Sequence, residues 1–211
     1  MNVWLMALES TLLYILPPLL VVTGLLPKVA IMPLLWAVFL YAVVVLHRSG
    51  ADILRFHIDW PALRYILARF VLLAALMTVF VIHFFPQMFF SLPRQHPLFW
   101  LLILLLYPLL SALVQEIVFR AFFAYRFESR IPNRSLFLLS NAILFAYIHS
   151  VFGNAIAVVF SFIGALLFMS TYLKTRSVAM STIEHSLYGN LVFTLGIGQF
   201  FYHNGTHLPP F

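Results

Sequence analysis

Gln115-Glu116-Ile117-Val118-Phe119-Arg120 interrupts an otherwise apolar run over residues 97–124. Two similar interruptions follow, Phe145-Ala146-Tyr147-Ile148-His149 and Glu184-His185-Ser186-Leu187-Tyr188-Gly189-Asn190. An ionisable side chain at membrane depth is costly, roughly 2.5–3.5 kcal/mol for Asp, Lys or Arg on insertion scales. Several such groups in one part of the chain therefore indicate a shared functional site, with each group's partner among the others.

The composition excludes an ordinary soluble domain. The 211 residues are 64% hydrophobic and only 9% charged, whereas soluble domains carry about 25% charged residues. No cysteine is present, which excludes disulfides, thiolate-bound zinc and thiol nucleophiles. The net charge of +6 is spread over short connectors, so we expect the bilayer surface, and no nucleic acid, as its partner.

Seven apolar runs are long enough to approach the roughly 20 residues that span a bilayer. We therefore predict one all-α integral membrane domain over residues 1–211, a polytopic transmembrane bundle of about seven helices. The runs cover about 3–26, 29–47, 66–86, 97–124, 135–151, 154–174 and 177–199.

Basic residues favour alternate connectors, which orients the chain by the positive-inside rule. The connectors with few basic residues hold only Lys28 and Arg94. We expect a cytoplasmic N-terminus and an outer C-terminus, in a bacterial inner (cytoplasmic) membrane. The richer connectors carry Arg48, Arg55, Arg64, Arg69, Arg126, Arg130, Arg134, Lys174 and Arg176.

Helical spacing groups the polar residues by face. Glu116 and Arg120 are four apart and share one face, as do Phe145 and His149. Asn190 is rotated by about 140° from His185 on an ideal helix, so these two need not face the same cavity.

One carboxylate, two imidazoles, an arginine and carboxamides suit hydrolysis by activated water. The carboxylate removes a proton from water with the help of one imidazole, and the other polar groups stabilise the oxyanion. A divalent metal such as zinc, held by Glu116, His149 and His185, is an equally consistent interpretation of the spacing.

The order Glu-x-x-x-Arg, Phe-x-x-x-His, then His followed by Asn resembles the three motifs of the CAAX protease and bacteriocin-processing (CPBP, or Abi) family of intramembrane proteases. The resemblance covers about 111–195, with a family-like catalytic core at about 97–200. It implies an endopeptidase that cleaves a membrane-associated protein or peptide, with Glu116, His149 and His185 as catalytic residues. On this basis we expect water activation by glutamate without an obligatory metal.

Two positions depart from the family pattern. The first motif normally begins with two glutamates, and the first of them falls on Gln115, which cannot accept a proton. Either Glu116 or Glu184 then acts as the base, and Glu116, paired with Arg120, needs the least new geometry. The family usually has Asn or Asp four residues after the last His, where this chain has Gly189, so Asn190 is the candidate substitute.

Gln115 also leaves a second class of function open. A chain that keeps the fold but has lost the base would be a non-catalytic membrane partner: a pseudoprotease, an immunity factor or an assembly factor. A haem protein with His149 and His185 as axial ligands ranks below both. A transporter also ranks below them, because no inverted repeat or paired broken helices are visible.

Overall fold

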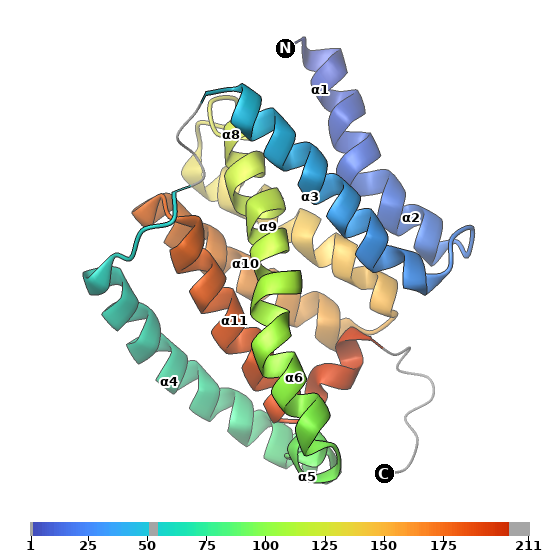
Figure 1. Ribbon diagram of the computed structural model, residues 1–211, viewed down its shortest axis with the longest axis vertical. Coiled ribbons are helices and arrows are strands. Elements are labelled where there is room, and N and C mark those ends of the chain that lie inside the picture. The colour runs from blue at the N-terminus through green and yellow to red at the C-terminus, as the bar shows by residue number, and fades with distance from the viewer. Residues whose placement is uncertain (1, 51–54, 203–211) are drawn as a thin grey trace.

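The computed structural model describes residues 2–50 and 55–202, and within these ranges its regular structure is entirely helical (Figure 1). The predicted all-helical membrane bundle is confirmed. Six helical segments among the described residues are long and apolar enough to cross a membrane. Helix α11, in the seventh predicted run, has 17 residues and is not among these six. In chain order the segments are α1 Val3–Ser10, η1 Thr11–Ile15 and α2 Leu16–Val22; η2 Lys28–Ala30 and α3 Ile31–Arg48; α4 Trp60–Phe84; η3 Pro86–Met88 and α5 Ser91–Gln95; α6 Pro97–Tyr107, η4 Pro108–Ala112, α7 Leu113–Glu116, η5 Ile117–Phe122 and α8 Phe123–Phe127; α9 Arg134–His149 and η6 Ser150–Phe152; α10 Ala155–Thr175; α11 Val178–Thr194 and η7 Ile197–Phe201.

Short polar side chains fix where four of these helices begin. Asp59, Asn133, Asn154 and Ser177 each accept a hydrogen bond from the backbone amide three residues later, at 2.9, 2.9, 2.8 and 3.3 Å respectively. Each bond satisfies an amide that has no partner inside the helix. The cap at Asp59 starts α4 at Trp60, earlier than the apolar run beginning at 66 predicted.

The segment 97–127 is the central element of the bundle. Its first part, α6, exposes leucines to the surroundings, whereas every residue from 116 to 124 is buried. That buried part packs against α3, α9 and α10 and contributes more buried residues to the largest apolar cluster than any other segment does. Glu116 and Arg120 of the first motif therefore lie in the most enclosed part of the fold.

Helix α4 lies at the outside of the bundle, alongside α11 (Figure 1). Three kinds of contact join the two helices. Arg69 forms an ion pair with Glu184, the rings of Phe70 and Tyr188 lie 5.4 Å apart, and Ala62 and Ile66 belong to an apolar cluster with α11.

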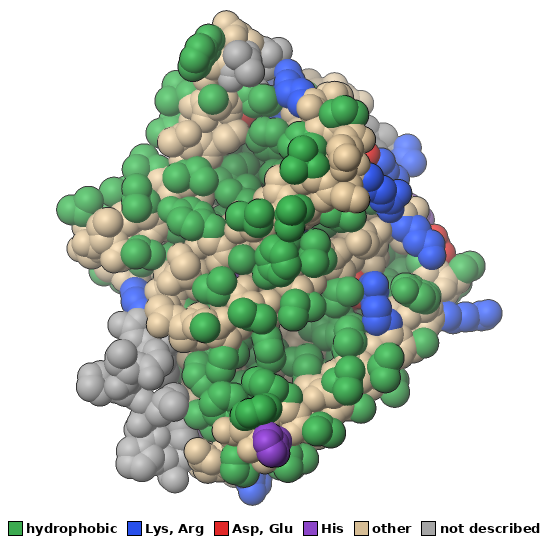
Figure 2. All heavy atoms as spheres, turned by 180° about the vertical axis from the view of Figure 1, so that it is seen from behind, with side chains coloured by type: hydrophobic (Ala, Val, Ile, Leu, Met, Phe, Trp, Pro, Cys, Tyr) green, Lys and Arg blue, Asp and Glu red, His purple; other side chains and the backbone are tan. Residues whose placement is uncertain are grey.

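Most of the exposed basic residues lie at one end of the bundle, along one edge of the surface in Figure 2. The up-and-down path of the helices brings the connectors after α3, α8 and α10 to this end. Arg126 binds Glu9 there at 2.7 Å. Arg176 donates two hydrogen bonds to Glu128, at 2.6 and 2.5 Å, and these bonds lower the pKa of the Glu128 carboxyl.

Gly196 joins α11 to the last helical turn through a close backbone approach. Its φ is +92°, and a Cβ at this position would lie 1.8 Å from the carbonyl oxygen of Met88. The amide of Phe90 donates to the carbonyl of Leu195 beside it, at 3.3 Å. No side chain fits at Gly196 without moving the connector between α4 and α6.

We predict that Gly196→Ala lowers the free energy of unfolding by about 2–3 kcal/mol, because strain in the left-handed region adds to the clash. Gly24 is the matched control, since its φ is +76° but nothing lies within 4 Å of the place that a Cβ would occupy. Gly24→Ala should lower the free energy of unfolding by only about 1 kcal/mol, which is the cost of the left-handed backbone conformation without a clash. Reversible unfolding in mixed detergent measures both, and equal losses would contradict the prediction.

Candidate active site

Glu116 and Arg120 form a wholly enclosed ion pair on the central segment. Both side chains are 0% exposed, and Arg120 Nε donates to Glu116 Oε2 at 3.1 Å. The planar guanidinium also lies over the ring of Phe145, 4.8 Å from its centroid, and 5.7 Å from that of Phe168. Buried charges require such partners, because desolvation alone would disfavour both ions.

Asn141 connects this pair to α9. Arg120 Nη1 donates to Asn141 Oδ1 at 2.6 Å, and Asn141 Nδ2 donates to the carbonyl of Phe119 at 2.8 Å. Both ends of the Asn141 carboxamide are thus used on the central segment. The contact sets the rotation of α9, and with it the direction of His149 two turns later.

His185 lies at the centre of a chain of hydrogen bonds that joins three helical segments. Its Nδ1 is 2.9 Å from Glu116 Oε1, and its Nε2 is 3.0 Å from the hydroxyl of Tyr107. A carboxylate only accepts hydrogen bonds, so its presence assigns the hydrogen to Nδ1 and leaves Nε2 as the acceptor. Phe168 stacks on the imidazole at 4.5 Å with an interplanar angle of 17°.

His149 ends α9 and is oriented by its own helix. Its Nδ1 is 2.7 Å from the carbonyl oxygen of Phe145, so Nδ1 is the donor and Nε2 is left as an acceptor. The Phe145 ring lies beside both imidazoles, with centroids 4.5 Å from His149 and 5.9 Å from His185. The second motif thereby supplies one imidazole and the aromatic ring that packs against the other.

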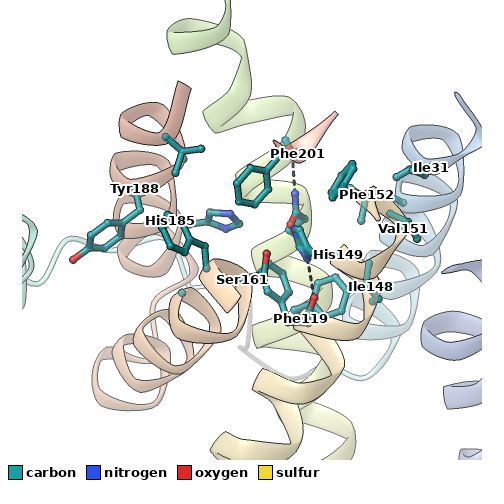
Figure 3. A pocket seen from close by; sticks show the side chains of 18 of the residues that line it. Ile31, Phe119, Ile148, His149, Val151, Phe152, Ser161, His185, Tyr188 and Phe201 are labelled. Carbon is teal, nitrogen blue, oxygen red and sulfur yellow. Dashed lines mark hydrogen bonds between the residues drawn. The ribbon is translucent and has the colours of Figure 1, made fainter. Parts of the chain in front are cut away.

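A cavity of about 720 Å³ opens in front of these groups, and His149 and His185 both line it. In Figure 3 the two imidazoles approach the same space from α9 and α11. Gln115 and Ser111 also line it, and Gln115 Nε2 donates to Ser111 Oγ at 2.8 Å. Glu116 is wholly enclosed and does not line the cavity, but its hydrogen bond to His185 connects it to a residue that does. The remaining lining is mainly apolar and comes from α2, α3, α4, α10 and η7.

Two of the sequence-predicted residues lie away from this group. Glu184 is buried on another side of α11, where it pairs with Arg69 and accepts from Thr171 Oγ1 at 2.5 Å. Asn190 Nδ2 donates to the carbonyl of Leu104 at 3.3 Å. Pro108 has no N–H to offer that carbonyl, four residues before it, so Asn190 satisfies an acceptor that the proline leaves open.

The helix of the central segment contains a π-helical turn on each side of Glu116. η4, which begins at Pro108, and η5, which begins at Ile117, are π-helical turns. Such turns are frequent at functional sites because they shift the faces that a helix presents. Here η4 lies between the exposed α6 and the buried part of the same segment, and η5 lies within that buried part.

The donors do not assemble as a metal centre. Among residues 2–50 and 55–202, no three or more His, Asp or Glu side chains are grouped so that they could hold an ion. Both oxygens of Glu116 are bonded, one to Arg120 and one to His185. In this arrangement Glu116, His149 and His185 therefore do not fit the zinc site that the spacing left open as an alternative.

The fold and the enclosed polar cluster define a polytopic membrane protein with a buried candidate active site. Residues 97–191 match the family model described as type II CAAX prenyl endopeptidase, Rce1-like, and all three motifs lie within the match. This match confirms the resemblance to the CAAX protease and bacteriocin-processing family, which implies an intramembrane protease that acts on a membrane-embedded protein or peptide. No curated protein and no solved structure matched the chain.

Tyr107 and Phe168 are the members of the cluster that sequence analysis did not select. Both contact His185, at its Nε2 and on its ring face. Neither stands out in an apolar run rich in aromatic residues. The signal that could have drawn attention to Tyr107 is its place immediately before Pro108, in the same run as Gln115 and Glu116.

We predict that Arg120→Leu lowers the free energy of unfolding by about 3–5 kcal/mol, because it leaves the Glu116 carboxylate enclosed without a counter-ion. The matched control is Arg176→Leu, which removes an arginine from a half-exposed pair with Glu128. That change should lose less than about 1 kcal/mol. Unfolding in detergent tests both variants, and a small loss at Arg120 would mean that the carboxylate is neutral or hydrated.

Proposed function

We propose that this protein is an intramembrane endopeptidase that hydrolyses a peptide bond of a membrane-associated protein or peptide with water activated by Glu116 and histidine. The observation that carries the proposal is the hydrogen bond from His185 Nδ1 to the wholly enclosed Glu116, beside a cavity lined by two imidazoles. A carboxylate behind an imidazole is the arrangement that prepares the far nitrogen to accept a proton.

Glu116 acts through His185 in this proposal. The carboxylate holds the hydrogen on Nδ1, so Nε2 is the acceptor that takes a proton from water. The imidazolium that results lies 2.9 Å from the carboxylate, which stabilises its charge, as in other carboxylate–histidine pairs. When the tetrahedral intermediate collapses, the same nitrogen returns the proton to the departing amine.

His149 and Gln115 orient the reactants. His149 Nε2 is an acceptor, because its Nδ1 hydrogen is used on Phe145, and it can hold the second hydrogen of the attacking water. Gln115 lines the cavity with one amide hydrogen on Ser111, so its other hydrogen is available to a substrate carbonyl. Neither residue needs to change its protonation state.

The size and lining of the cavity favour a substrate segment that is apolar and locally unfolded. Its volume of about 720 Å³ and its mainly apolar lining suit a short extended segment with apolar side chains or an attached lipid. The name of the matched family refers to prenylated CAAX peptides, which have this character. A peptide bond inside a helix is inaccessible, so the segment must be extended before it is cleaved.

The distribution of basic residues supports a cytoplasmic N-terminus. Arg126, Arg134 and Arg176 lie at the end of the bundle where Glu9 of the first helix also lies, and positive charge favours the cytoplasmic side. A bacterial inner membrane is the location that we propose on this basis.

Gln115 is the observation that favours a second function, a non-catalytic membrane partner. It occupies the position where the family's first glutamate falls, and it lines the cavity without a titratable group. In such a protein the buried Glu116 network would serve only to hold the helices together.

Mass spectrometry of membrane-protein termini in cells carrying wild type or Glu116→Gln, His149→Ala or His185→Ala separates these functions. Wild type should generate termini that each variant reduces by about 10²–10⁴-fold, the usual contribution of a positioned acid or base. Glu128→Gln, at the exposed basic end of the bundle, is the control and should cleave like wild type. Identical termini in every strain, with the proteins folded, would reject the protease.

Glu184→Gln tests the assignment of the base. Glu184 is bonded to Arg69 and Thr171 on the side of α11 that faces α4, so we predict that this variant keeps cleavage at a rate within about 10-fold of wild type. A loss as large as that of Glu116→Gln would transfer the role of the base to Glu184.

Gln115→Glu should alter the rate of cleavage, because it adds a titratable group beside the reacting water.

A further inference from the structure

Gly189 leaves a space beside His185 that another helix fills. It lies one turn after His185, where the resembling family usually has Asn or Asp. A Cβ at Gly189 would lie 2.2 Å from Tyr107 Cε1 and 2.4 Å from its hydroxyl oxygen. The ring of Tyr107 thus occupies the volume into which a side chain at 189 would project.

The Tyr107 hydroxyl also has the contact that an amide or carboxylic acid at 189 could make. It is 3.0 Å from His185 Nε2, and Tyr107 lines the cavity together with both imidazoles. Its ring packs edge-on against His185, with centroids 6.0 Å apart, and against Phe193 at 5.6 Å. The phenol is therefore fixed in direction by the two rings from α11.

The approach of α6 to α11 is built around this contact. Gly189 presents no side chain to the Tyr107 ring, and the next residue, Asn190, donates to Leu104 on the same helix as Tyr107. Trp100 Nε1 donates to Thr194 Oγ1 one turn further on, at 3.0 Å. Three successive contacts between α6 and α11 thus hold Tyr107 against the imidazole of His185.

We propose that Tyr107 is a catalytic residue that donates a hydrogen bond to the oxyanion, in place of the polar residue that the family carries at position 189. This inference rests on the proposed function. In the resting site the phenol hydrogen is directed at Nε2. An imidazole nitrogen has one lone pair, so the phenol hydrogen must leave Nε2 and turn to another acceptor as water gives its proton to that nitrogen.

The acceptor that appears at that moment is the oxygen of the substrate carbonyl. The water oxygen forms a bond to the carbonyl carbon, and the carbonyl π electrons move to its oxygen as negative charge. Tyr107 then accepts from Nε2–H and donates to this oxyanion, without losing its own proton. Collapse breaks the carbon–nitrogen bond, and Nε2–H supplies the proton to the amine. The Tyr107 hydroxyl therefore links the two events, because it accepts from the nitrogen that has taken the proton of water and donates to the oxyanion.

The test uses the full-length protein in lipid vesicles and a peptide spanning a cleavage site found for wild type. Tyr107→Phe removes only the hydroxyl, so kcat should fall by about 10²–10³-fold, the usual loss of one oxyanion donor, while KM changes little. Tyr147→Phe is the control, because it removes a hydroxyl that donates to the carbonyl of Ile15 at 3.1 Å, outside the cavity lining. It should cleave like wild type.

The double variant Tyr107→Ala/Gly189→Asn removes the ring and places the family's amide in the space it leaves. It should recover at least about 10-fold over Tyr107→Ala, roughly half of the logarithmic loss expected for one oxyanion donor, and such recovery would support the replacement. A Tyr107→Phe rate equal to that of wild type, or a double variant no faster than Tyr107→Ala, would overturn the inference. Absence of cleavage by wild type itself would instead reject the proposed function, and the inference with it.

Discussion

The enclosed carboxylate of Glu116 is the constraint on which the rest of the site depends. A carboxylate without water must have its charge matched and its lone pairs used, or it becomes neutral. Arg120 supplies the counter-charge from the next turn, and His185 supplies a hydrogen bond from α11. Since Arg120 is in turn bonded to Asn141 on α9, satisfying one carboxylate fixes three helical segments relative to one another. The same bonds that hold the bundle together set the tautomer of His185.

The helical architecture was accessible from the sequence because it follows from local properties. Each apolar run of about 20 residues must satisfy its own backbone hydrogen bonds in lipid, and a helix is the only way for a single segment to do so. The helix starts were less accessible, since the cap at Asp59 starts α4 at Trp60 although Pro61 and Arg64 interrupt the apolar pattern before residue 66. The π-helical turns in the central segment were not predicted. Pro108, at the start of η4, interrupts the α-helical hydrogen bonds but does not specify a π-helical turn, and η5 contains no proline.

The candidate site was accessible in part, for a geometric reason. Residues four apart share a face, so the pairing of Glu116 with Arg120 follows from spacing alone. The angle of about 140° between His185 and Asn190 on an ideal helix likewise agrees with their different surroundings, a cavity and the Leu104 carbonyl. That Glu184 faces α4 and that Tyr107 fills the space at Gly189 could not be inferred in this way. Both depend on contacts between segments distant in the sequence, and only the packed bundle brings those segments together.

The position of Glu116 behind the cavity wall determines which chemicals can meet it. A molecule that enters the cavity encounters two imidazoles, a carboxamide, hydroxyl groups of tyrosine and serine and the amine of Lys28, but no carboxylate among the lining residues that the structure describes. Carbodiimides and other carboxyl-directed reagents have no surface to attack there, whereas imidazole-directed electrophiles do. An inhibitor for this cavity should therefore be designed around histidine chemistry and an apolar body, even though the residue that we propose as the source of the site's basicity is a glutamate.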